Sequence, residues 1–210
     1  MKKFNWHKNI FISLFIFVFL LPANNLKWPD INIKNLETKS WRKIIQRCDK
    51  LNKKNSVEYP RNTVGTILVT KDNLTGFIPF VGHVGIILDQ RTVVQAGPFD
   101  GVYYGPNDWD KSKITCYAAV PKNLDSKKFI KAANWASKKE GSKYNFNFFD
   151  WKNKDADKFY CSQLVWAAYY NTCEFDLAPK KQMILFPADL INDDLLTEII
   201  YFKNDKHEKK

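Results

Sequence analysis

The order of its short β-prone and helical segments constrains the fold of this chain more than any other feature. Four segments are rich in Val, Ile and Thr and are separated by Gly, Pro, Asp and Asn; they cover residues 64–70, 83–88, 92–96 and 114–120. Such segments predict the strands of an antiparallel sheet. Helical patterns precede and follow them. This order favours an α+β fold, in which an antiparallel β-sheet packs against helices.

Three stretches carry apolar residues at helical spacing, namely residues 38–51, residues 126–139 and the stretch that begins at Cys161. Cys48 falls on the apolar stripe of the first stretch, which predicts a buried packing thiol. Ser126 is expected to cap the second helix at its start, and Gly141 follows its end. Two later segments are expected to add strands, residues 183–185 and 197–202.

The first residues of the chain predict export. Lys2, Lys3 and Lys8 precede an unbroken apolar run over residues 10–21. This run is shorter than the roughly 20 residues of a membrane-spanning helix, and Ala23 supplies a small residue for cleavage. We expect a mature protein that begins near Asn24 and is secreted or held at the cell surface. An uncleaved membrane anchor is the alternative.

Four parts of the chain follow from these patterns: a signal peptide or anchor (1–23), a helix and linker (24–62), the main folded domain (63–202) and a charged tail (203–210). The formal charge is +11, and it falls to +8 without the three lysines of residues 1–23, which contain no acid. A basic exported protein favours anionic envelope partners, through peripheral contact with wall or membrane. No nucleic-acid-binding motif accompanies the lysines. The alternative is that they serve solubility alone.

The cysteines and histidines predict neither a disulfide framework nor a metal site. The cysteines are Cys48, Cys116, Cys161 and Cys173. Cys161 and Cys173 would lie about 18 Å apart on one helix, beyond the reach of a disulfide. No CxxC pair is present, and the histidines are scattered at positions 7, 83 and 207. We therefore expect no metal and no cofactor; the sequence leaves the oligomeric state open.

Cys161 and His83 are the candidate nucleophile and base. The helical pattern begins at Cys161, so the helix dipole and free backbone N–H groups would stabilise a thiolate and hold an oxyanion. His83 is the only histidine inside the predicted domain. The alternatives are a cysteine that only packs and a structural histidine in an apolar strand.

Gln95 is the candidate orienting residue. If residues 89–91 form a three-residue hairpin loop, Gly85 faces Gln95, and His83 becomes a diagonal neighbour of Gln95 on one face. Gln95 would then accept a hydrogen bond from Nδ1–H and leave Nε2 toward the thiol. A two-residue loop would put Gln95 on the opposite face, and a solvated strand glutamine is the other alternative.

Residues 64–190 resemble the NlpC-like cysteine peptidases, specifically their circularly permuted YiiX-like or YycO-like branch, which has a papain-type fold. The resemblance rests on the motifs VGTIL (64–68), GHVGI (82–86), VQA (94–96), FYCSQLVW (159–166) and PADL (187–190). It implies Cys161 as nucleophile, His83 as base and Gln95 at the orienting position. Thr66 and Gln95 depart from the aspartate and glutamate that the family commonly has at these places.

Tyr160 and Asp189 also match family positions, which implies that they line the substrate site. The alternatives are that Tyr160 only packs and that Asp189 only caps a turn. The chain is thus expected to be an exported cysteine hydrolase of amide bonds, in cell-wall peptides such as those of peptidoglycan. A lipid-directed thiol acyl hydrolase or acyltransferase and a non-catalytic wall-binding module are the rival interpretations. Aromatic residues in two expected loops, 97–113 and 141–158, either line a groove or pack.

Overall fold

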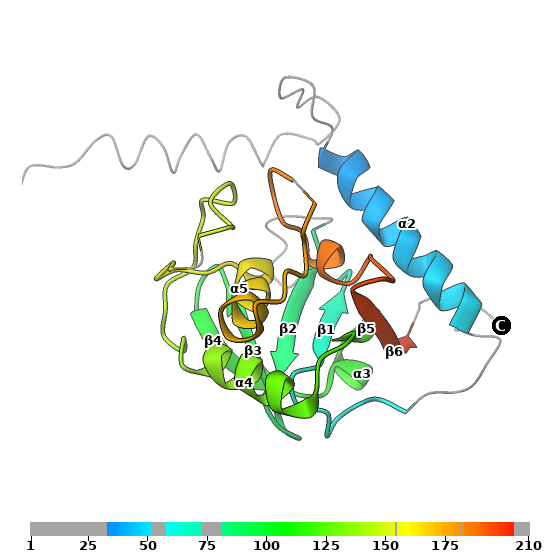
Figure 1. The fold of residues 1–210 in the computed structure, drawn as a ribbon, viewed down its shortest axis with the longest axis horizontal. Coiled ribbons are helices and arrows are strands. Elements are labelled where there is room, and N and C mark those ends of the chain that lie inside the picture. Colours follow the sequence, from blue (N-terminus) through cyan, green and yellow to red (C-terminus); the bar gives the residue numbers. More distant parts are fainter. Residues whose placement is uncertain (1–32, 52–57, 73–80, 154, 181, 204–210) are drawn as a thin grey trace, which may run out of the picture.

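The computed structural model describes residues 33–51, 58–72, 81–153, 155–180 and 182–203. The predicted signal peptide, its cleavage site and the charged tail lie outside these residues. One antiparallel sheet has the strand order β4-β3-β2-β1-β5-β6 (Figure 1). Its strands are β1 (Ile67–Thr70), β2 (His83–Ile87), β3 (Thr92–Gly97), β4 (Gly101–Pro106), β5 (Cys116–Pro121) and β6 (Thr197–Lys203). The expected α+β class is confirmed.

The helices lie mainly on one face of this sheet (Figure 1). They are α2 (Ile33–Leu51), α4 (Ser126–Ser137) and α5 (Cys161–Cys173), with the four-residue α3 (Trp109–Ser112) and the 3-10 helix η1 (Pro187–Leu190). The main core forms between α2, α4, α5 and the sheet. A smaller cluster on the opposite face contains Tyr59, Trp109 and Cys116. Within the described part of the chain, no helix has the length and apolar character needed to cross a membrane.

The four predicted strands are found with ends shifted by one to three residues. The fourth starts at Cys116 because the backbone N–H groups of Ile114 and Thr115 bond to the carboxylate of Asp72, at 2.5 and 3.1 Å, and so are not available to a ladder. The helix expected over residues 38–51 begins earlier, at Ile33. Cys48 is fully buried in the core, as its place on the apolar stripe predicts.

Three expectations about secondary structure are wrong. The expected loop 97–113 contains β4, an edge strand that pairs with β3 from Gly97↔Gly101 to Thr92↔Pro106. Residues 183–185 form no strand; they lead into η1. The N-cap of α4 is Asp125 rather than Ser126, because the Asp125 side chain accepts the Lys128 N–H at 2.9 Å.

Candidate active site

Cys161 is the first residue of α5 and lies at the centre of the candidate site. The helix starts there because Tyr160 is extended and the Leu164 N–H bonds to the Tyr160 carbonyl at 2.9 Å. Residues 161–169 are all buried, so the helix is packed on every side at this end. The Cys161 side chain is 5% exposed. All four cysteines of the protein are free thiols.

The thiol is held close to several hydrogen-bond donors, but burial decides its protonation. Burial raises the pKa of Cys161; the Ser162 hydroxyl, 3.8 Å away, and nearby backbone N–H groups oppose this effect. Those N–H groups belong to Val84, Ser162 and Cys161 itself. The donors at the helix start act in the expected direction, but desolvation of the anion outweighs them and favours the neutral thiol.

Cys161 meets the sheet where β2 and β3 separate. The pairing of these strands ends at Gly85↔Gln95, so Val84 lies beyond the paired part of β3. Its N–H faces the Cys161 sulfur. Tyr103, directly opposite Gln95 in β4, has its pKa raised by burial, by Asp100 and by the nearby charge of Cys161. The sulfur therefore lies near Val84, which follows His83 in β2, and near Tyr103, which faces Gln95 from β4.

His83 and Gln95 form a buried hydrogen bond. The three-residue loop is confirmed by the register Gly85↔Gln95 and by the Leu88 N–H bond to the Thr92 carbonyl at 2.9 Å. Nε2 of His83 lies 2.7 Å from Oε1 of Gln95, and the side chains are 4% and 5% exposed. The expectation that Nδ1 makes this bond is wrong. Because the amide oxygen only accepts, Nε2 carries the hydrogen and Nδ1 has the free lone pair.

Gln95 is confined from the other side by Gly105 of β4. A Cβ atom at Gly105 would lie 1.9 Å from Nε2 of Gln95, so a larger residue there would displace the amide. Burial lowers the pKa of His83 to about 3, with a contribution from the charge of Lys113, while the hydrogen bond to Gln95 acts in the opposite direction. At neutral pH the imidazole is uncharged, which is the form a general base requires.

Trp109 covers the His83 ring, with ring centroids 5.6 Å apart and planes at 30°. The ammonium of Lys113 lies 5.6 Å from the Trp109 ring centroid. The sequence placed Trp109 among the loop aromatics that either line a groove or pack, and did not connect it with His83. Only the position of α3 brings this ring to His83.

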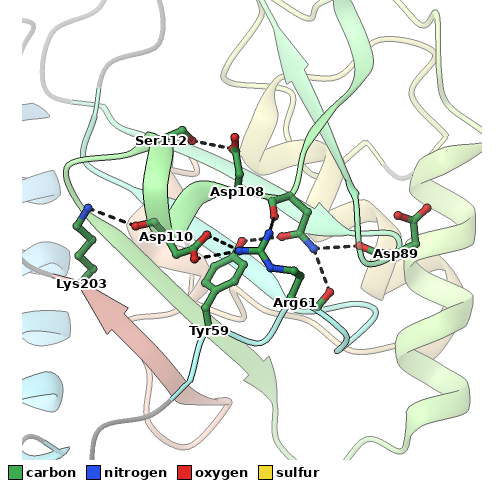
Figure 2. A network of polar contacts seen from close by, with 8 residues as sticks. Tyr59, Arg61, Asp89, Asp108, Asp110, Ser112 and Lys203 are labelled. Atoms are coloured by element: carbon green, nitrogen blue, oxygen red, sulfur yellow. Dashed lines mark hydrogen bonds and ion pairs between the residues drawn. The ribbon is translucent and has the colours of Figure 1, made fainter.

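A polar network fixes α3 in this position (Figure 2). Asn107 is its node: Oδ1 accepts from the Tyr59 hydroxyl at 2.6 Å, and Nδ2 donates to the carbonyls of Arg61 and Asp89 at 3.1 and 2.9 Å. Arg61 also pairs with both carboxylate oxygens of Asp110 at 2.9 Å. The network therefore joins α3 to the chain before β1 and to the β2–β3 turn.

The thiol and the imidazole approach the end of the β2–β3 pairing from opposite faces of the sheet. Cys161 packs in the core of the helical face, whereas His83 stacks on Trp109, which belongs to the other cluster. Among the residues described, no hydrogen bond joins Cys161 to His83. Contacts of this kind are often long in a free enzyme and shorten when substrate binds.

Tyr160 is buried directly beside the nucleophile. Its ring packs edge-on against Phe148, with centroids 5.1 Å apart. Its hydroxyl has no partner with hydrogen-bond geometry, although the Leu185 backbone is close enough to favour the phenolate slightly. Burial is the main effect and raises the pKa of Tyr160. The predicted substrate-binding role of Tyr160 stays a prediction.

Asp189 uses both carboxylate oxygens in structural contacts. Oδ1 accepts from the Ser40 hydroxyl at 2.6 Å and from Asn192 Nδ2 at 3.2 Å. Oδ2 accepts the Phe186 N–H at 2.9 Å, which caps η1. Asp189 therefore ties α2 to the segment beside Tyr160. These contacts correspond to the turn-capping alternative; its substrate-binding role also stays a prediction.

Within the described ranges, no group of three or more His, Cys, Asp or Glu side chains is placed to hold a metal ion. The candidate site contains a buried thiol, a neutral imidazole with one free nitrogen, and an orienting amide. These are the side-chain types that papain-type thiol hydrolases use.

Comparison with known proteins agrees with this class. Residues 68–199 match the family described as permuted papain-like amidase enzymes, YaeF/YiiX, C92. This range is more than half of the 210-residue chain. The protein therefore belongs to the permuted papain-like amidase family, and the resemblance noted in its sequence motifs is confirmed.

The chain is similar to two known proteins. It is 29% identical over 123 residues to the uncharacterised protein YycO of Bacillus subtilis (strain 168), a match covering 57% of this chain and 49% of YycO. The matched part thus spans about half the length of that relative. YiiX of Escherichia coli O157:H7, described as a metalloprotein, is 20% identical with a TM-score of 0.46, over 58% of this chain and 72% of YiiX.

Proposed function

We propose that this protein is an exported cysteine hydrolase that cleaves amide bonds in cell-wall peptides. The observation that carries the proposal is the buried His83–Gln95 hydrogen bond on β2, next to Val84, whose N–H faces a thiol at a helix N-terminus. Membership in an amidase family supports the class of bond. The apolar run over residues 10–21 and the basic composition support an anionic substrate in the cell envelope.

The first half of the reaction forms an acyl-enzyme. As the Cys161 sulfur attacks the amide carbonyl carbon, its proton passes to Nδ1 of His83, and the carbonyl oxygen becomes an oxyanion. Free N–H groups at the start of α5, of Cys161 and Ser162, are the donors proposed to stabilise it. The imidazolium then gives the proton to the leaving amine as the carbon–nitrogen bond breaks.

Water completes the cycle. His83 Nδ1 takes a proton from water as the hydroxide adds to the thioester carbonyl, and the proton returns to the sulfur as the acid leaves. Gln95 keeps the ring oriented through Nε2–H in both halves. Because burial disfavours the imidazolium, the amide oxygen of Gln95 is the nearby dipole that compensates for it.

The test compares Cys161→Ala with Cys173→Ala, a matched removal of a thiol from the other end of the same helix. Full-length protein is incubated with muropeptides, and released amine and the intact mass of the protein are followed. We expect amine release and an acyl adduct in wild type and Cys173→Ala, and neither in a folded Cys161→Ala. Full activity of Cys161→Ala would refute the proposal. Acyl release from phospholipid instead of amine release would assign the protein to the lipid-directed class.

A further inference from the structure

A groove opens between the β3–β4 turn and the segment after α4. Its volume is about 390 Å³, and its lining includes Phe99, Asp100, Lys143, Tyr144, Phe146 and Lys158. This size suits one or two amino-acid residues rather than a long stretch of polymer. We call it the Lys143 groove.

The two walls of the Lys143 groove are fixed to one another through backbone hydrogen bonds. The Gly141 N–H bonds to the Val102 carbonyl at 2.9 Å, and the Val102 N–H bonds to the Ser142 carbonyl at 2.8 Å. Gly101 has φ +68°, and a Cβ atom there would lie 2.1 Å from the Ser142 carbonyl oxygen. The close contact of the walls therefore requires glycine at position 101.

The groove is also tied to the segment that enters α5. The Phe159 N–H bonds to the Lys143 carbonyl at 3.1 Å, and Lys158 precedes Cys161 by only three residues. A series of aromatic rings leads in the same direction. Tyr144 packs edge-on against Phe148 with centroids 6.5 Å apart, and Phe148 packs against Tyr160 at 5.1 Å. The groove is thus joined through Lys143 and this series of rings to Tyr160, the residue before Cys161.

The chemistry of the lining selects the ligand. Lys143 and Lys158 are both exposed and carry two positive charges, opposed by the single carboxylate of Asp100. Phe99 and Phe146 are 74% and 56% exposed, so apolar surface adjoins the cations. The groove is complementary to a small group that combines a negative charge with apolar atoms.

We infer that the Lys143 groove binds a free carboxylate of a peptide substrate, next to the amide bond that Cys161 attacks. This inference rests on the proposed function. Lysine ammonium groups pair with phosphate as readily as with carboxylate, but the family is one of amidases, whereas the acyl bonds of glycerophospholipids are esters. A peptide that offers an amide bond for cleavage also carries free carboxylates, so carboxylate is the anion we expect in this groove.

The test uses two peptides that differ only in a free carboxylate or a carboxamide near the scissile bond. Their Kd values are measured with the full chain carrying Cys161→Ala, so that binding is read without turnover. We expect this protein to bind the carboxylate form about 3- to 10-fold more tightly at low salt, with the preference falling as ionic strength rises. The double substitution Lys143→Gln/Lys158→Gln should abolish the preference. Asp100→Asn should increase it.

A second groove provides the matched control, since it also contains two lysines and an aromatic ring. Lys131 and Trp135 of α4 and Lys138, the C-cap of that helix, line it. Lys131→Gln/Lys138→Gln removes the same charge and should leave the preference unchanged. Equal binding of the two peptides, or an equal loss of preference in this control, would overturn the inference. So would binding to phosphatidylglycerol vesicles that depends on Lys143 and Lys158 while the peptide pair is not distinguished.

Failure of the proposed function has a different signature. Wild-type protein that distinguishes the two peptides in binding but releases amine from neither would leave the carboxylate site supported and the hydrolase proposal refuted. With turnover present, the same preference should appear in KM, while kcat stays within about twofold.

Discussion

Nε2 of His83 donates a hydrogen bond to Oε1 of Gln95 over 2.7 Å, and neither side chain is open to solvent. The bond orients the ring with Nδ1 as its free nitrogen. It also opposes the effect of burial on the pKa of His83, which is nevertheless lowered to about 3. The two residues therefore contribute differently to the proposed reaction.

Substitutions at these two positions should separate their roles. His83→Ala removes the base and should lower kcat/KM by about 10²- to 10⁴-fold. Gln95→Ala should cost less, because strand packing and Trp109 still hold part of the ring orientation. Gln95→Glu should preserve or raise the rate, since a carboxylate stabilises the imidazolium. The rate of Cys161 alkylation against pH, measured in all four proteins, is the direct readout. Identical profiles for wild type and His83→Ala would exclude the pair.

Burial of a neutral His83 should make stability depend on pH. The folded pKa, about 3, lies below the ordinary value of 6.5, so the unfolded chain binds more protons between these values. Stability is then fully present above pH 6.5 and is lost as the pH falls toward 3. We expect wild type to lose about 1 to 2 kcal/mol more than His83→Gln between pH 7 and pH 5. Urea unfolding at the two pH values measures the difference; parallel losses would contradict the buried neutral form.

Asn107 should be important for stability because it is buried and satisfies three partners. Asn107→Ala leaves the Tyr59 hydroxyl without its acceptor and should destabilise the fold by about 2 to 4 kcal/mol. Ser112→Ala removes an exposed bond to Asp108, at 2.8 Å in the same network, and should change stability by less than about 0.5 kcal/mol. Urea midpoints of the two variants provide the comparison (Figure 2). Equal changes in the urea midpoints of Asn107→Ala and Ser112→Ala would show that Asn107 does not hold α3 in place.

Export predicts a mature N-terminus near Asn24. Cleavage after Ala23 would remove the apolar run and three lysines. N-terminal sequencing of protein recovered from the medium or cell surface checks this. Recovery of Met1 from the membrane fraction would instead favour an uncleaved anchor.

The sequence by itself determined the elements that depend on local rules. For a three-residue loop, alternation places Gln95 opposite Gly85 and on the face of His83, because a strand has a period of two residues; the register confirms that loop length. Helical periodicity likewise located the start of α5 at Cys161. The order of these motifs was enough to identify the family.

Only the tertiary structure decided what depends on distant segments. The segment around Tyr103, expected to be a loop, forms β4 because it hydrogen-bonds to β3. Local composition does not encode this pairing. Asp189 accepts a hydrogen bond from Ser40, which lies 149 residues earlier in the chain. The same holds for protonation: the helix N-terminus favours a thiolate at Cys161, but desolvation by the surrounding core raises its pKa, and burial is a property of the whole fold.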